Sequence, residues 1–114
     1  MIFVDDMYKS NMGRFRGMNM SHMIAIDEKE LHAMAKRIGV ARHWYQGDHY
    51  DVCMSKRALA VKYGAIEVSM RELSAICWCV RNDWEFLTPA HAVELMLNKL
   101  RPRGKSKLGA IING

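Results

Sequence analysis

The sequence predicts an α/β fold: a small, at least partly parallel sheet packed with helices in a single domain. Short apolar runs alternate along the chain with amphipathic segments of helical period, which favours strands alternating with helices. Helix-capping residues stand at the starts of the helical segments. A length of 114 residues with half of them hydrophobic suffices for one modest core and not for two. We therefore expect one domain over residues 1–100 and a basic tail over residues 101–114.

The individual elements follow from apolar periodicity and from caps. Short apolar runs predict strands over residues 1–4, 20–26, 40–45 and 65–68. Apolar positions on one face predict four helices, whose N-terminal caps are Asp27, Ser55, Ser69 and Thr88. Residues 7–19 are rich in Met, Gly and Arg without a period, so we predict a loop there.

The run from His49 to Ala65 carries the most informative polar chemistry. Lys56 and Arg57 fall in the first turn of a predicted helix, where free backbone N–H groups and the helix dipole already favour an anion. Two cations at this end oppose the dipole, so helix stability does not explain them. A phosphate or carboxylate ligand would explain them, although a solvated helix face is the simpler alternative.

Aromatic residues interleave with polar ones around this run, a pattern that suits a stacked nucleobase with clamped phosphates. We therefore predict a binding module for an anionic, nucleotide-like small molecule. The residues predicted to meet its anionic part are Arg14, His22, His49, Lys56 and Arg57. Those predicted to read a base or sugar are Trp44, Gln46 and Tyr50. Ordinary core packing is the competing interpretation for the aromatic residues.

An enzyme is the alternative, namely a metal-dependent phosphoesterase or nuclease. In it Asp5, Asp6 and Asp51 would hold a divalent metal, and His22 or His49 would act as general base. Capping or turn roles for the carboxylates compete with this interpretation. The histidines form neither an H-x-x-x-H nor an H-E-x-x-H pattern, so the sequence does not predict a zinc site. The excess of cations over clustered carboxylates favours binding without turnover, and we expect no cofactor.

A third possibility is an interaction protein that forms an oligomer without a small ligand. Half of the ten methionines lie within residues 7–23, and the last two predicted helices carry apolar stripes, so we expect a homo-oligomer, with a dimer favoured. No run approaches the ~20 apolar residues of a membrane span. The start of the chain is unlike a signal peptide, and three cysteines give no disulfide framework, so a cytoplasmic location is expected.

The net charge of +5 is concentrated near the C-terminus. Five of the 17 lysine and arginine residues lie within residues 99–107. This tail could bind a nucleic-acid backbone, but it lacks aromatic residues and is more simply a solvated extension.

Several motifs together carry a family resemblance. They are Val4-Asp5-Asp6, Gly13-Arg14, Ser21-His22-Met23-Ile24-Ala25, Glu30-Leu31-His32-Ala33-Met34-Ala35, Trp44-Tyr45-Gln46-Gly47-Asp48 and the run from His49 to Ala65. In this order they resemble domain of unknown function 4031, a small family of bacteria and phages, over residues 2–70. The resemblance implies no activity. Because phages are included, sequestering a host nucleotide immune signal, an anti-defence role, is one form that binding could take.

The chain departs from the family pattern at two places. The family shows Cys where this chain has Ser21, so any redox or metal role of that Cys is absent here. It shows Asp followed by Thr or Ser where this chain has Ile26-Asp27.

Overall fold

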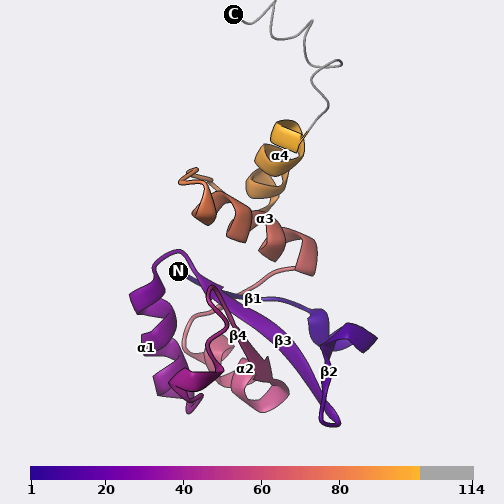
Figure 1. Ribbon diagram of the computed structural model, residues 1–114, viewed down its shortest axis with the longest axis vertical. Coiled ribbons are helices and arrows are strands. Elements are labelled where there is room, and N and C mark those ends of the chain that lie inside the picture. Colours follow the sequence, from indigo (N-terminus) through magenta and orange to yellow (C-terminus); the bar gives the residue numbers. More distant parts are fainter. Residues whose placement is uncertain (101–114) are drawn as a thin grey trace, which may run out of the picture.

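The computed structural model describes residues 1–100, which build one mixed sheet between two pairs of helices (Figure 1). The central strand is β3 (Met18–Ala25), which pairs antiparallel with β1 (Ile2–Val4) on one edge and with β4 (Tyr50–Cys53) on the other. Strand β5 (Ile66–Glu67) runs parallel to β1. The predicted α/β fold with a partly parallel sheet is therefore confirmed.

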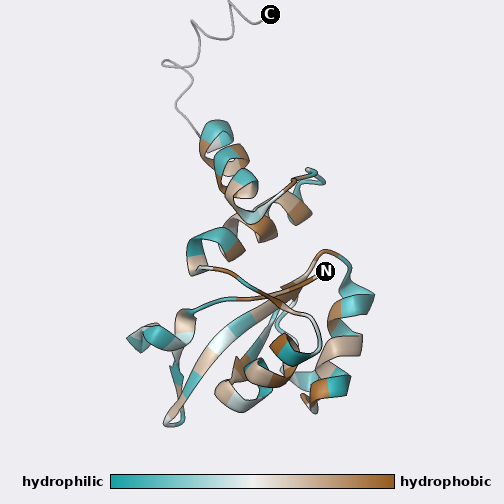
Figure 2. Cartoon of the chain, turned by 180° about the vertical axis from the view of Figure 1, so that it is seen from behind, coloured by the Kyte–Doolittle hydropathy of each residue, from teal (hydrophilic) through white to brown (hydrophobic). Residues whose placement is uncertain are grey.

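The helices cover both faces of this sheet. α1 (Glu28–Ile38) and α2 (Met54–Lys62) lie on one face, and α3 (Met70–Arg81) and α4 (Pro89–Leu100) lie on the other. Figure 2 shows the alternation of hydrophobic and hydrophilic residues along the helices that this two-sided packing requires.

Strand alternation divides the apolar residues between two cores. Val4 and Met23 belong to the core beneath α1 and α2, while their neighbours Phe3 and Ile24 belong to the core beneath α3 and α4. Successive side chains of a strand point to opposite faces, so His22 lies on the same face as Ile24. The histidine therefore lies on the α3 side of the sheet, at a point where its side chain keeps part of its exposure.

Three of the predicted helix caps are confirmed. The Asp27 carboxylate accepts a hydrogen bond from the Lys29 backbone N–H at 3.1 Å, and the Ser69 hydroxyl accepts one from the Glu72 N–H at 3.1 Å. The Thr88 hydroxyl likewise accepts from the backbone of His91. Each contact satisfies an N–H group that the helix itself leaves without a partner.

Two strand and loop predictions were wrong. Residues 40–45 form no strand and instead include a 3-10 helix over Arg42–Trp44, all of whose residues are exposed, because no neighbouring strand lies beside them to pair with. Residues 7–19 are not a loop throughout. They contain two 3-10 turns, Met7–Lys9 and Asn11–Gly13, followed by a hairpin of β2 (Arg14–Phe15) against the start of β3.

The start of α2 also differs from the prediction. The helix begins at Met54 and its N-cap is Cys53, whereas Ser55 lies inside the first turn. The strand β4 immediately before it was missed, because a run of Tyr, Asp, Val and Cys has only two strongly apolar residues. These two residues, Tyr50 and Val52, both face the core under α1 and α2.

None of the helices within residues 1–100 combines the length and apolarity needed to cross a bilayer. The predicted basic tail, residues 101–114, lies outside the described residues.

Candidate functional site

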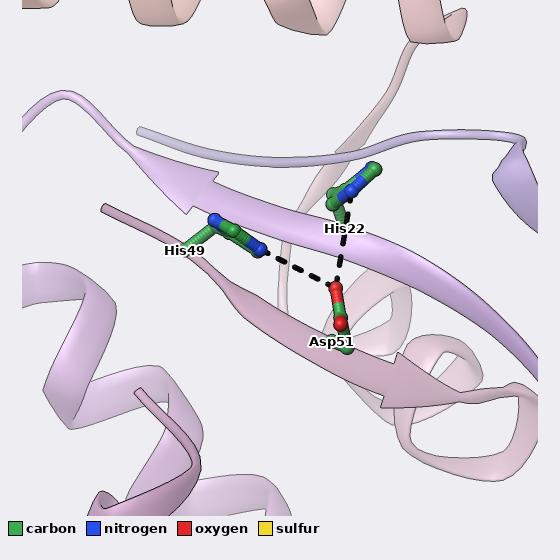
Figure 3. A group of neighbouring side chains, drawn as sticks. All are labelled: His22, His49 and Asp51. Atoms are coloured by element: carbon green, nitrogen blue, oxygen red, sulfur yellow. Dashed lines mark ion pairs between the residues drawn. The ribbon is translucent and has the colours of Figure 1, made fainter. Parts of the chain in front are cut away.

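Two histidines and a carboxylate meet on the α3 side of the sheet (Figure 3). His22 on β3 stands directly opposite Asp51 on β4 in the antiparallel register. His49 precedes β4 and lies two residues before Asp51, so an extended chain puts both on one face. One nitrogen from each ring and one Asp51 oxygen all lie within 4.8 Å of one another. Sheet register thus assembles a cluster from residues nearly 30 positions apart.

The carboxylate of Asp5 holds the ring of His22. Asp5 is fully buried at the end of β1 and accepts hydrogen bonds from the His22 backbone N–H at 2.8 Å and the Met7 N–H at 3.2 Å. Its other oxygen lies 2.7 Å from Nδ1 of His22. Because an ionised carboxylate only accepts, Nδ1 carries the hydrogen, and in the neutral ring Nε2 carries the lone pair.

His49 is held in the same way by a different carboxylate. Its Nδ1 lies 2.6 Å from Oδ1 of Asp48, whose Oδ2 pairs with the guanidinium of Arg81. Partial burial raises the pKa of Asp48, but the hydrogen bonds from His49 and Arg81 outweigh it and bring the pKa below its usual value. Asp48 therefore stays ionised and leaves the lone pair of His49 on Nε2.

The free Nε2 atoms of both rings face one oxygen of Asp51. Oδ1 of Asp51 lies 3.5 Å from Nε2 of His49 and 3.9 Å from Nε2 of His22. This oxygen is buried and accepts no hydrogen bond from any residue of the described chain. With neutral rings, three acceptors would face one another without a donor, an arrangement that costs free energy unless a proton on one ring or a metal cation lies between them.

The charges around the cluster favour the same conclusion. The hydrogen bond to Asp5 raises the pKa of His22, burial opposes the rise, and the charges of Asp5, Asp51 and Asp48 add to it. Three carboxylates surround the two rings, and within residues 1–100 only Arg81 forms an ion pair that offsets one of them. With both rings neutral this leaves about two negative charges, the amount that one divalent cation cancels.

The spacing suits a transition metal. Ligand atoms about 2.0–2.1 Å from a tetrahedral zinc ion lie roughly 3.3 Å from one another. The distances of 3.5 and 3.9 Å from the two rings to Asp51 exceed this by a few tenths of an ångström, and all three ligand atoms lie within 4.8 Å of one another. Side-chain movement that draws the three atoms together would close the site around an ion. Imidazole nitrogens select zinc, iron, nickel or copper over magnesium or calcium. Two histidines and one carboxylate also leave a coordination position open for water, as in catalytic sites.

A pocket of about 380 Å³ adjoins the cluster at Asp51. Gln46 connects the two, because its Nε2 donates to Oδ2 of Asp51 at 2.8 Å. Trp44 and Lys56, both predicted ligand residues, also line this pocket. Its other lining residues are mostly apolar: Phe15, Met18, Met20, Gly39, Val40, Ala41, Val52 and Cys53.

The two predicted cations of α2 both have structural contacts. Nε of Arg57, a buried residue, donates to the carbonyl of Asp5 at 2.9 Å, and its Nη1 pairs with Glu67 at 2.8 Å. Nζ of Lys56 lies 3.0 Å from where a Cβ of Gly39 would be, at the C-terminal end of α1, where a cation stabilises the helix. These contacts give the pair a structural role that neither the predicted ligand nor the alternative of a solvated helix face included, and anion binding there stays a prediction.

The remaining predicted ligand residues are dispersed. Tyr50 is fully buried and its hydroxyl lies 2.7 Å from Nδ1 of His32, so it belongs to the core. Arg14 lies exposed on β2. Of the predicted ligand set, the structure brings His22 and His49 together in the cluster and Trp44, Gln46 and Lys56 together in the pocket.

The three carboxylates predicted to hold a metal do not lie together; they belong to Asp5, Asp6 and Asp51. The Asp5 carboxylate is hydrogen-bonded to His22, and Oδ1 of Asp6 accepts a hydrogen bond from the Met70 N–H at 3.0 Å, at the start of α3. Asp51 alone of the three joins the cluster.

Two further residues join the site. The sequence places Asp48 in a turn after Gly47 and allows it to come near the other carboxylates in space, whereas it suggests no role for Arg81. The spacing of His49 and Asp51 offered a signal, since alternate residues share a face once the segment is recognised as a strand. Nothing in the sequence links Arg81 to Asp48, 33 residues away, because the tertiary fold alone brings them together.

Comparison with known proteins supplies a family and no activity. No curated protein and no solved structure shows significant similarity to this chain. The sequence pattern of one family, described as a protein of unknown function, matches residues 2–79, which include the whole His22, His49 and Asp51 cluster. The chain therefore belongs to the DUF4031 family.

Proposed function

We propose that this protein binds a divalent transition-metal ion through His22, His49 and Asp51 and uses it to hydrolyse a phosphoester. One observation carries the proposal: both imidazoles are held by carboxylates at Nδ1 so that their Nε2 atoms converge on one unpartnered oxygen of Asp51. Metal-binding histidines commonly have such carboxylate partners, which fix the tautomer and raise ligand basicity.

The chemistry follows from the open coordination position. A bound divalent ion lowers the pKa of its water to about 7 and so supplies hydroxide at neutral pH. Asp5 and Asp48 would keep the two rings oriented with Nε2 toward the metal. Asp51 would hold the metal through Oδ1, while its Oδ2 accepts a hydrogen bond from Gln46 that fixes the carboxylate. Positive charge at the metal would also stabilise the charge that develops on the phosphoryl oxygens.

The metal itself is tested by calorimetric titration with Zn²⁺ and Mn²⁺ and by the visible absorption of bound Co²⁺. The wild-type protein should bind one ion per chain, and His49→Ala and Asp51→Asn should bind far more weakly. The control is His91→Ala, because this histidine lies on α4, its ring accepts a hydrogen bond from the Leu87 N–H, and the bond from its backbone N–H to the Thr88 hydroxyl is kept in the variant. Equal affinity in wild type and His49→Ala would exclude this site.

Turnover is tested separately with bis(p-nitrophenyl) phosphate. We expect metal-dependent release of nitrophenol by the wild type and by His91→Ala, and none by His49→Ala. A protein that binds metal at this site and cleaves no phosphoester would contradict the hydrolytic half of the proposal.

Binding of a nucleotide-like ligand without turnover is the second candidate. The observation that favours it is the pocket that joins Trp44, Gln46 and Lys56 beside the cluster. Incubation with a mixed nucleotide extract, followed by denaturation and mass spectrometry of the released compound, separates the two. An intact nucleotide indicates a binder, for which sequestering a signal is one use, and a hydrolysed one indicates the enzyme.

A further inference from the structure

We propose that the substrate is single-stranded nucleic acid, held between the β2–β3 hairpin and Trp44; this inference rests on the proposed phosphoesterase function. Figure 1 shows the hairpin extending away from the helices, at the end of the molecule opposite α4. It has two ladder pairs, Arg14 with Asn19 and Phe15 with Met18. Its turn residues Arg16 and Gly17 both have positive φ, 50° and 77°, as in a two-residue type I′ turn.

The hairpin exposes apolar side chains toward the pocket. Phe15 and Met18 are 43% and 44% exposed and line it together with Trp44, which is 46% exposed. Trp44 reaches the pocket from the 3-10 helix after α1, so the hairpin and this helix contribute aromatic rings from two separate segments. Exposed aromatic rings beside a pocket give nucleobases surfaces on which to stack.

Two cations lie beside these aromatic rings. The Arg16 guanidinium lies 5.1 Å from the centre of the Phe15 ring, whereas Arg14, the neighbour of Phe15 on β2, points to the opposite face of the hairpin. Lys56 lies within the pocket, and Asp51 is the one acidic residue that lines it. Asp51 is already engaged by Gln46 and by the histidine cluster. Apolar rings with cations around them match the needs of stacked bases and their phosphates.

The position of Arg16 favours a polymer over a single nucleotide. Its guanidinium lies against the Phe15 ring at the edge of the pocket, and Arg16 does not itself line the pocket. A mononucleotide inside the pocket would leave this guanidinium without a phosphate, whereas a strand that continues past Phe15 brings a further phosphate to it. Asp51 lines the pocket and faces both histidines, which line a second cavity together with Asp5, Asp48 and Arg81. A strand that continues past Asp51 into this second cavity would bring a phosphodiester to the proposed metal.

Gln46 offers a hydrogen-bond acceptor that could recognise a nucleobase. The carboxylate of Asp51 only accepts, so the amide nitrogen of Gln46 must face it, and the amide oxygen stays an acceptor. A base that offers an N–H group to the pocket fits this acceptor, as thymine and uracil do through their ring imide.

The test is fluorescence anisotropy with labelled oligothymidylate and chelator-treated, metal-free protein. Trp44→Ala should weaken binding about tenfold or more, the reduction expected when one base has no ring to stack on. Arg16→Ala should weaken binding and lower the slope of log affinity against log salt by about 0.7, the change expected when one phosphate is no longer neutralised. The matched control is Lys29→Ala, which removes one exposed cation from the first turn of α1, at the end of that helix opposite Gly39 and the pocket.

Three results would overturn the inference. They are the absence of oligothymidylate binding, equal binding by wild type and both site variants, and competition by thymidine monophosphate as strong as that by the oligonucleotide. Circular dichroism and melting of each variant show that the exposed substitutions leave the fold intact.

A cleavage assay distinguishes a failure of this inference from a failure of the proposed function. His49→Ala should bind oligothymidylate like the wild type and fail to cleave it when metal is added. If His49→Ala cleaves as well as the wild type, the metal site is wrong while the strand-binding surface stands. If the metal site is confirmed and no strand binds, only the present inference fails.

Discussion

At the residue scale, the site depends on which nitrogen of each histidine carries the hydrogen. Asp5 and Asp48 decide this, because each accepts from Nδ1 and leaves the Nε2 lone pair toward Asp51. The two carboxylates differ in burial, since Asp5 is fully buried and Asp48 is partly exposed. Asp48 is thus the better position at which to test the tautomer without unfolding the protein.

Asp48→Asn should lower metal affinity about 10- to 100-fold, the usual effect of removing a carboxylate partner behind a ligand histidine. An amide nitrogen placed at Nδ1 of His49 would favour the other tautomer and put the hydrogen on Nε2, where the metal must bind. Calorimetry measures the change. Asp83→Asn is the control, because Asp83 lies exposed in the turn after α3 at a φ of 58° that Asn also tolerates. Equal reductions in both variants would contradict this role.

The raised pKa of His22 gives metal-free protein a distinct pH dependence. Protonated His22 is favoured in the folded state, so its contribution to the free energy of unfolding is fully present below the ordinary pKa of 6.5. That contribution is lost as pH rises through the raised pKa of the folded protein. The melting temperature of wild type relative to His22→Asn, with chelator present, should therefore fall from slightly acidic to alkaline pH. A difference independent of pH would contradict the Asp5 contact.

At the element scale, similar capping signatures gave different structures. Ser69 and Glu72 form the full reciprocal box, with the Glu72 carboxylate accepting from the Ser69 N–H at 2.9 Å. Asp27 caps α1, but Glu30, the expected partner, pairs with the N-terminal amine instead. Ser55 is no cap at all. Capping motifs therefore located the starts of α1 and α3 and failed for α2, whose N-cap Cys53 is the last residue of β4 and makes no side-chain capping hydrogen bond.

Ser69→Ala should reduce the free energy of unfolding by about 0.5–2 kcal/mol, the usual cost of removing an N-cap hydroxyl. Ser55→Ala is the matched control, because that hydroxyl contacts only the Cys53 sulfur at 3.4 Å. Urea denaturation followed by circular dichroism measures both. A larger reduction for Ser55→Ala would show that the helix starts are assigned incorrectly.

The start of α2 also makes one of the three cysteines reactive. Partial burial raises the pKa of Cys53, but hydrogen bonds from the Ser55 hydroxyl and from the Lys56 and Ser55 N–H groups outweigh it, so the pKa is lowered. Burial raises the pKa of Cys77 and of Cys79. Iodoacetamide near neutral pH should therefore modify Cys53 first, since the thiolate is the nucleophile. Peptide mass spectrometry over time measures the order, and earlier labelling of Cys77 would contradict it.

At the scale of the whole molecule, exposed apolar residues gather where α3 turns into α4. Leu87 is 88% exposed, Leu97 44% and Trp84 36%. We keep the prediction of a two-fold dimer that buries more than about 1,000 Å² in total. Light scattering should give twice the chain mass, and Leu87→Ser should shift the protein toward the monomer. A wild-type mass near 13.1 kDa at micromolar concentration would contradict the dimer.

The sequence by itself determined much of the fold. Apolar period and caps located β1, β3, β5 and all four helices, because these signals arise from neighbours within a few residues along the chain. The strand β4 was not predicted, because its two apolar residues are separated by Asp51. The sequence also named His22, His49 and Asp51 as separate candidates.

Only the tertiary structure decided how those candidates combine. The register of β3 against β4 sets His22 opposite Asp51, and the end of β1 brings Asp5 beneath the ring. Arg57, predicted as a ligand residue, donates hydrogen bonds to the Asp5 carbonyl and to the Glu67 carboxylate. Such choices depend on contacts between segments distant in the chain, whose partners local spacing does not encode. The sequence thus named the three clustered residues among other candidates, while the partners Asp48 and Arg81 and the geometry that joins them depend on the tertiary structure.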